Sequence, residues 1–480
     1  MNEDSPFQIQ HWEEPEIEFN GGLETSPKRG LLKYGPRLEE DKHHTITLGI
    51  IGDRDTIRNL QSLLRDMEIG IHPGNKDQPQ QVPFPGVGED SRLKISIHTK
   101  RSWRFQIRDD YIDRVEGQDT VRERMDYFLD IVEDKIDLLD TDNISPNVVI
   151  VCIPQRVMDA CTPADEEYSQ IQSEGSNLHN RIKLMGMERR LPTQLIKPST
   201  LDVSKSEKRA KRAWNLTVGM LYKSQEGHPW KTREIEEGVC YAGISFYRVS
   251  GNNSEVRAAL AHVFRGKDHV ILQSDPLEDI EEDNSGQPHL SEEGAEAVVS
   301  QILEHYRERK GMYPHRFVLH KTSEFWDRER DGARSAATKI EDLDLVTIRG
   351  RPDIRVYPDS DFPAVRGTVL SVPEDDLHYL YTTGFVPEQM TYEGSNVPRP
   401  IEVVPDPEQC PTPADQLCRE ILFFTKLDWN TSEYSVRMPA TLGVAKSVGK
   451  VLSEPVTEEM DDLRPEYYYY RACHRIHLIA

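Results

Sequence analysis

The sequence predicts an α/β fold, because short apolar runs that suit buried strands alternate with stretches of helical periodicity. The run TITLGII at 45–51 is followed by a helix pattern over 54–67. A second helix pattern over 121–139 is followed by the apolar run NVVIVCIP at 147–154. Strand and helix therefore alternate at the spacing of βαβ units, which predicts a parallel sheet.

The chain is long enough to bury a substantial core, and its composition is that of a globular protein of roughly two to four domains. It has 480 residues, of which 36% are apolar and 30% charged. Its six cysteines form no C-x-x-C pair, so we expect reduced thiols in the cytosol. The start MNEDSP lacks the features of a signal peptide, and no apolar run reaches the ~18 residues that span a bilayer. We therefore expect a cytoplasmic protein without a membrane partner.

Three successive regions are expected. Residues 1–44 are acidic and punctuated by Pro and Gly turn signals, which predict an extended arm. Residues 45–235 contain the patterns above and a further apolar run, LTVGMLYK at 216–223, which we expect to be a strand. The turn GIIGDR in this region matches neither of the glycine-rich nucleotide-binding motifs, so it predicts an ordinary strand-to-helix turn.

The third region, 236–480, opens with a strand pattern, GVCYAGISFYRV at 238–249. Several strands, then helices, then a strand and helix again give an order that is compatible with a ribonuclease H-like sheet, although periodicity alone does not select that fold. Further strands are expected at 262–266, 269–274, 316–322, 343–350, 354–360, 367–372 and 378–385, and helices at 292–311, 325–340, 413–430 and 439–454.

Positive charge is concentrated in one part of an acidic chain. The formal net charge is −24, yet the block from Asn177 to Arg233 holds thirteen Lys or Arg against four Asp or Glu. The distribution of charge decides nucleic-acid binding more than the sum does. A solvated, charged surface explains such a block equally well, so the charge alone leaves both interpretations open.

Four residues of this block form a set that suits a terminal phosphate. On a helix His179 and Lys183 lie on one face, four residues apart. Gln194 begins the apolar strand that follows, and Lys223 ends the run LTVGMLYK. Two amines supply charge and the amide supplies a directed donor. The alternative is that each is a separate surface group, and spacing alone does not exclude it.

Segments along most of the chain resemble, in order, those of short prokaryotic Argonautes, which consist of MID and PIWI domains without N and PAZ domains. The resemblance implies a Rossmann-like MID domain at 45–235 and a ribonuclease H-like PIWI domain at 236–480. It also implies that His179, Lys183, Gln194 and Lys223 hold the 5′-phosphate of a guide. The matching segments are EPEIEFNGGLETSPKRGLLKYGP in the arm, VLHKTSEF (318–325), YTTGFVP (381–387), VPRPIEV (397–403), FFTKLDWNT (423–431) and MPATLGVAKSVG (438–449).

The resemblance places other residues where a slicing PIWI domain has its metal-binding carboxylates. The aligned positions are Ser245, Thr322 and Lys446. Two hydroxyls and a cation do not hold two hard divalent ions, which require anionic oxygen ligands. We therefore expect a non-cutting protein. Acids nearby, such as Glu324, fall on other positions, and catalytic geometry tolerates little displacement.

Further nucleic-acid contacts are implied at Lys426, Asn430 and Lys450, each of which has an alternative interpretation as an ordinary helix-face or turn residue. In Argonautes a C-terminal carboxylate commonly helps to hold Mg²⁺ at the guide phosphate. Here the end EYYYYRACHRIHLIA runs several residues past its Tyr cluster. This difference puts the metal role of Ala480 in question.

The function implied by the resemblance is guided recognition of nucleic acid, with base pairing supplying the specificity. Short Argonautes typically use a guide RNA against invading DNA and act with an APAZ-containing effector, a sirtuin-like or TIR NADase or a nuclease, as a heterodimer in prokaryotic immunity. Two alternatives stay open. One is an active ribonuclease H-like nuclease with displaced metal ligands, and the other is an interaction scaffold that no longer binds nucleic acid.

Overall fold

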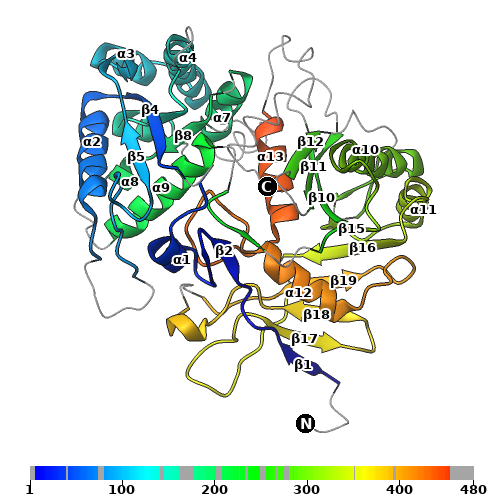
Figure 1. Ribbon diagram of the computed structural model, residues 1–480. Helices are drawn as coiled ribbons and strands as arrows, with labels where there is room; N and C mark the ends of the chain where they lie inside the picture. Colours follow the sequence, from blue (N-terminus) through cyan, green and yellow to red (C-terminus); the bar gives the residue numbers. More distant parts are fainter. Residues whose placement is uncertain are drawn as a thin grey trace.

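The structure is a computed structural model, and Figure 1 shows its elements. The residues that it describes are 6–38, 42–73, 81–140, 145–162, 178–189, 191–201, 208–225, 228–232, 236–248, 256–264, 269–273, 280–284, 286–350, 352–392 and 396–454.

The first sheet consists of parallel strands. Its order is β5 (Ile95–His98), β4 (His44–Gly52), β7 (Val148–Cys152) and β8 (Thr193–Ile196), with β6 (Arg104–Gln106) also paired to β4. Every residue of β7 is buried, as expected when helices cover both faces of a parallel sheet. The predicted parallel sheet is confirmed.

Helices pack on both faces of this sheet (Figure 1). Alternate residues of β7 belong to two hydrophobic clusters, one shared with α2 and α9 and the other with α3, α4 and α7. Capping side chains fix where two of the helices begin: Asp53 accepts from the Thr56 amide (2.8 Å), and Thr120 forms a capping box with Glu123. The bounds are α2 (Arg54–Ile69), α3 (Asp109–Glu116), α4 (Val121–Leu139), α5 (Gln155–Ala160), α7 (Leu178–Glu188), α8 (Pro198–Leu201) and α9 (Arg209–Ser224).

The strand expected at 216–223 is wrong, because these residues form the second half of helix α9. All eight are buried, so the helix carries no polar face in this half from which sequence periodicity could be seen. A short apolar run can be a buried strand or part of a buried helix, and its length does not distinguish them. Lys223 therefore lies in the last turn of a helix and not at a strand end.

The second sheet has nine strands. Three central parallel strands, β10 (Val239–Arg248), β15 (Arg316–Lys321) and β16 (Asp342–Arg349), are flanked on both sides by antiparallel ones. The full order is β1 (Gln8–His11), β17 (Thr368–Val372), β18 (Leu377–Leu380), β19 (Ile401–Pro405), β16, β15, β10, β11 (Val256–Phe264) and β12 (His269–Gln273).

Helices of the described chain also pack around this sheet (Figure 1). Helix α13 packs closely on β10, because Gly243 lies so near the Thr441 carbonyl that a side chain there would collide with it. Helices α10 and α11 pack on each other and share a core with β10, β15 and β16. The predicted helices are thus confirmed, with bounds α10 (Glu292–Lys310), α11 (Asp327–Ala336), α12 (Ala414–Phe424) and α13 (Ala440–Leu452).

Two further expectations need correction. The arm at 1–44 is not simply extended, because Ser26 caps an eight-residue helix, α1 (Pro27–Tyr34), and the strands of the arm join two sheets. The strand expected at 354–360 is absent from these described residues; the Val356 amide donates to the Tyr381 hydroxyl (2.9 Å) instead of to a neighbouring strand. The arm also supplies β2 (Ile17–Phe19) and β3 (Gly22–Glu24), which pair with β9 (Lys231–Thr232).

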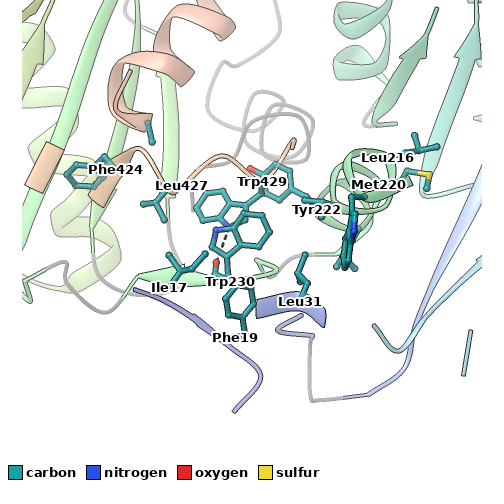
Figure 2. Close-up of a cluster of buried hydrophobic side chains, with 14 of the residues drawn as sticks. Ile17, Phe19, Leu31, Leu216, Met220, Tyr222, Trp230, Phe424, Leu427 and Trp429 are labelled. Carbon is teal, nitrogen blue, oxygen red and sulfur yellow. Dashed lines mark hydrogen bonds between the residues drawn. The ribbon is translucent and has the colours of Figure 1, made fainter. Parts of the chain in front are cut away.

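An aromatic cluster joins the arm, helix α9 and the segment that follows α12 (Figure 2). The Trp230 indole donates to the Lys426 carbonyl (3.0 Å), and the Trp429 indole donates to the Trp230 carbonyl (2.9 Å). Phe19 packs against Trp230 with ring centroids 6.1 Å apart. Tyr222 of α9 packs against Trp429 with ring centroids 5.8 Å apart, which places this part of the segment 425–434 beside α9.

In the described part of the chain no helix is long and apolar enough to cross a bilayer. Five of the six cysteines lie among the described residues, and all five are free thiols. Burial raises the pKa of the Cys161 thiol to about 11, so this thiol stays protonated at neutral pH.

Candidate nucleic-acid interface

A tight connection from α7 to β8 brings the predicted phosphate-binding residues together. Gly186 of α7 lies against the Leu191 carbonyl and the Thr193 side chain, and a Cβ there would be 2.6 Å from that carbonyl. The Thr193 hydroxyl donates to the Ile182 carbonyl (3.3 Å). The strand therefore returns directly alongside the helix, which places Gln194 beside the turn that carries Lys183.

Lys223 and Gln194 are in direct contact, because the Lys223 ammonium donates to the Gln194 side-chain oxygen. Lys223 is 3% exposed. Burial and the nearby charge of Lys183 lower the pKa of Lys223 to about 7. The amine is thus buried beside a second cation, an arrangement that an anion would stabilise.

His179 and Lys183 complete the group. Lys183 is 8% exposed, whereas His179 lies at the more open end of the cluster. Partial burial lowers the pKa of His179 to about 4, and the charges of Lys183, Lys223 and Lys197 add to this effect. The imidazole is therefore neutral at physiological pH. All four predicted residues lie in one cluster; this placement is geometric and does not show what they bind.

The segment after α12 borders this cluster. A Cβ on Gly219 of α9 would be 3.3 Å from the Asn430 carbonyl and 3.7 Å from the Gln194 side-chain oxygen, so Asn430 lies close to the predicted pocket. Asn215, one turn earlier, accepts hydrogen bonds from the Ser432 amide (3.0 Å) and hydroxyl (2.6 Å). Asp428 accepts from the Asn430 amide (2.9 Å).

Helix α13 adds two exposed cations beside α7. The Asn180 side chain donates to the Lys450 carbonyl (3.1 Å) and to Glu454 (3.2 Å), which joins the two helices. Lys446 and Lys450 are both exposed and stand one turn apart. Both side chains are therefore accessible to solvent.

Lys426 does not present its amine to a phosphate, contrary to the expectation from the resemblance. It is 2% exposed, and its ammonium contacts Glu14 (2.5 Å) and the carbonyls of Thr25 and Tyr434 (3.0 Å each). Burial lowers its pKa to about 7, against the opposing effect of Glu14. In this conformation Lys426 is a structural residue that fixes the arm to the segment 425–434.

The three positions that the resemblance matches to catalytic carboxylates belong to β10 (Ser245), to the residue after β15 (Thr322) and to α13 (Lys446). The last ladder pair of β10 and β15 is Gly243 with His320, two residues before Ser245 and Thr322 respectively. Helix α13, which carries Lys446, packs on β10. Among the described residues, no three His, Cys, Asp or Glu side chains converge as a metal site would require. Ala480 lies outside the described residues.

Known proteins match the fold of this chain but not its sequence. No protein-family model matches the sequence, and no curated protein matches it. Solved structures do match. Clostridium butyricum Argonaute, bound to a guide DNA and a 19-mer target DNA, is 15% identical with a TM-score of 0.59, over 93% of this chain and 54% of that one.

Two further solved structures match this chain over nearly its whole length. A. aeolicus Argonaute is 16% identical with a TM-score of 0.55, over 92% of this chain and 53% of that one. Drosophila Piwi is 15% identical with a TM-score of 0.58, over 96% and 56%. The chain spans about half the length of these proteins.

The chain has the fold of the MID–PIWI half of Argonaute. The predicted fold class, a Rossmann-like part followed by a ribonuclease H-like part, is thereby confirmed. Sequence reasoning missed two residues near the phosphate-type cluster, Lys197 and Asp428, whose charges reach His179 and Lys183 respectively. Lys197 directly follows the predicted strand that contains Gln194, so the sequence could have placed it near the cluster. The sequence showed no such sign for Asp428, which comes from the distant segment after α12.

Proposed function

We propose that this protein binds the 5′-phosphate of a short guide and senses a complementary target. The observation that carries the proposal is the burial of Lys223 beside Lys183, with its ammonium on Gln194. Burying two like charges together costs free energy that a bound dianion offsets. The fold similarity to Argonaute, solved with guide and target DNA, supports the same proposal.

The proposal includes no cleavage by this chain. Its support is chemical: the positions that the resemblance matches to catalytic carboxylates hold hydroxyls at Ser245 and Thr322 and an exposed lysine at Lys446. Divalent ions in such sites need several anionic oxygens. The guide would be RNA and the target invading DNA, in a cytoplasmic defence function against phage or plasmids.

The residues described around Lys223 do not by themselves fit Mg²⁺. Amines, a neutral imidazole and an amide already engaged by an ammonium suit a phosphate, whereas Mg²⁺ prefers carboxylates and water. A magnesium ion at the guide phosphate stays a prediction that depends on Ala480 and on the phosphate oxygens. No role in the proposed recognition is assigned to it.

A second polypeptide completes the proposed assembly. The chain spans about half the length of the solved Argonautes, and the partner is proposed from the resemblance to short Argonautes. We propose a stable heterodimer with an APAZ-containing effector that is activated by target pairing. A permanent complex of this kind would bury more than about 2,000 Å².

The test of guide binding uses 5′-phosphate and 5′-hydroxyl guides with Lys183→Ala/Lys223→Ala. Each charged hydrogen bond contributes about 1.5–3 kcal/mol, so the double variant should bind a 5′-phosphate guide at least a hundredfold less tightly than wild type. Lys100→Ala/Lys339→Ala removes the same charge from exposed positions and should change affinity little. Equal wild-type affinity for the two guides would contradict the phosphate pocket.

The test of the non-cutting sensor uses co-expression with the neighbouring gene's product. The two proteins should co-purify, and guide with target should activate the partner. That activation should survive Ser245→Ala and Thr322→Ala and fail in Lys183→Ala/Lys223→Ala. If the chain purifies alone and cleaves the target itself with Mg²⁺, the nuclease alternative replaces this proposal.

A further inference from the structure

A second basic segment lies outside the block at 177–233. Residues 91–108 hold six Lys or Arg and no Asp or Glu, in a chain whose formal net charge is −24. The segment contains β5, the short 3₁₀ helix η2 (Arg101–Trp103) and β6. Arg108 is paired with Asp110 (2.9 Å). The other five cations are exposed and form no ion pair within the described part of the chain: Arg92, Lys94, Lys100, Arg101 and Arg104.

These five cations follow one edge of the first sheet. Ile95 of β5 pairs with His44 of β4, and Gln106 of β6 pairs with Gly52, whereas β7 lies on the other side of β4. The eight residue steps from His44 to Gly52 cover about 26 Å, at roughly 3.3 Å per step in a strand. We call this row of five cations the basic edge.

The described contacts of the basic edge leave its charge in place. The Lys100 ammonium lies over the Trp103 ring, 4.3 Å from the centroid. The Arg104 guanidinium donates to the Thr99 carbonyl (3.4 Å). Both partners are neutral, so they orient the cations without cancelling their charge. The basic edge therefore presents several positive charges to solvent on an acidic protein.

We propose that the basic edge binds the phosphate backbone of a nucleic-acid duplex without sequence preference. One strand of a duplex carries a phosphate every ~3.4 Å along the helix axis, so an edge of about 26 Å faces about eight phosphates. At physiological salt, charges are screened beyond about 8 Å, so the local cations outweigh the more distant acidic surface. The inference does not rest on the proposed guide pocket, because Gln194 belongs to β8 at the opposite edge of this sheet.

Two observations favour a duplex over other polyanions. Single strands are held largely by bases that stack on accessible aromatic rings. Trp103 is 9% exposed and lies under Lys100, while Phe105 and Tyr111 pack against the hydrophobic cluster of α3 and α4. Protein interfaces are depleted of Lys, whereas an unbroken row of one charge sign suits evenly spaced phosphates.

The test measures binding of a DNA duplex of about 20 base pairs with 5′-hydroxyl ends to the full-length, guide-free protein. Fluorescence anisotropy is recorded over a series of salt concentrations. For wild type, the logarithm of affinity should fall against the logarithm of salt with a slope of about −4, since each neutralised phosphate contributes about 0.9. Lys100→Gln/Arg101→Gln/Arg104→Gln should bind at least tenfold less tightly at low salt, with a slope of about −2. Unchanged affinity and slope would overturn the proposal.

A matched variant separates the basic edge from net charge. Arg328→Gln/Arg334→Gln/Lys339→Gln removes three exposed cations near α11, two of which are paired with acids, and should bind the duplex as wild type does. Equal losses in the two triple variants would contradict the basic edge. Lys183→Ala/Lys223→Ala should also keep duplex affinity, so a failure of the guide pocket is distinguishable from a failure of the basic edge.

A single substitution keeps the test decisive if the triple variant does not fold. Lys94 has a φ of 49°, a conformation that Asn adopts more readily than most residues. Lys94→Asn therefore removes one charge without straining the backbone, and it should make the salt slope less steep by about one. Circular dichroism checks the fold of each variant. A wild-type slope in folded Lys94→Asn would contradict the proposal.

Two competitors test which polyanion the basic edge prefers. Single-stranded DNA of the same length and polyglutamate of the same charge should each displace the labelled duplex at least tenfold less well than unlabelled duplex does. Equal competition by the single strand would overturn the assignment to a duplex. Equal competition by polyglutamate would show that the basic edge fits an acidic protein instead.

Discussion

Two buried lysines, Lys223 and Lys426, have the same lowered pKa of about 7 but opposite surroundings. Lys426 is neutralised by Glu14 and is held by two backbone carbonyls. Lys223 instead lies beside another cation, Lys183, and donates to a neutral amide. A lowered pKa reports burial in both cases, so the partners of each amine distinguish a structural lysine from one suited to a ligand.

The largest expected effect is on stability at Lys426. Lys426→Met should lower the free energy of unfolding by about 3 kcal/mol, because Glu14 loses one of its two cationic partners inside the protein. Denaturant unfolding measures the change. Glu14→Gln/Lys426→Met should recover part of the loss, since the pair is removed together. A loss below about 1 kcal/mol would remove the distinction between the two lysines.

The second effect is on guide binding at Lys223. Lys223→Met should weaken binding of a 5′-phosphate guide by about 1.5–3 kcal/mol, roughly ten- to a hundredfold, because one charged hydrogen bond is lost. Its free energy of unfolding should change by less than about 1 kcal/mol, since a buried charge beside Lys183 is removed. Fluorescence anisotropy and denaturant unfolding separate the two quantities. If Lys223→Met is strongly destabilised but keeps its guide affinity, Lys223 is a structural residue and not a guide-binding one.

The third effect is on the pH dependence of guide binding. The pKa of Lys223 is about 7 without guide, and a phosphate dianion beside it raises that pKa, so binding takes up a proton above pH 7. Affinity for a 5′-phosphate guide should therefore fall, by up to about tenfold per pH unit, as pH rises above about 7. Below about pH 6 the phosphate itself loses charge, and affinity should fall again.

Two controls accompany this pH profile. The affinity for a 5′-hydroxyl guide should change little above pH 7. The affinity of Lys223→Met for either guide should also change little above pH 7. His179, with a pKa of about 4 without guide, is neutral through this range in the free protein. A flat profile for the phosphorylated guide would contradict the assignment of Lys223.

The smallest effect is expected at Lys450. This lysine is exposed on α13, so Lys450→Ala should weaken guide binding by about 0.5 kcal/mol, and the loss should shrink as salt is added. Titrations at low and at physiological salt measure the difference. A loss as large as that of Lys223→Met would show that α13 contributes a main phosphate contact.

The sequence predicted a helix or a strand correctly where the segment showed a clear periodicity or composition. Helix α4 was predicted from its helical periodicity, and strand β7 from an apolar run of Val and Ile, which are enriched in strands. Helix α9 was predicted as a strand over 216–223 because its second half is apolar on all sides. The role of Lys426 was beyond sequence reasoning, since it depends on Glu14 at the far end of the chain.

Strand β1 also constrains the order of events during synthesis. It pairs with β17, and Glu14 just after it pairs with Arg366 and Lys426. A ribosome adds roughly 5–20 residues per second, so these early residues wait on the order of tens of seconds for their partners. Through that interval the strand edge and the Glu14 carboxylate are exposed to other chains. The nine-stranded sheet is therefore completed late in synthesis. The pairing of β1 with β17 and the ion pairs of Glu14 with Arg366 and Lys426 then form together.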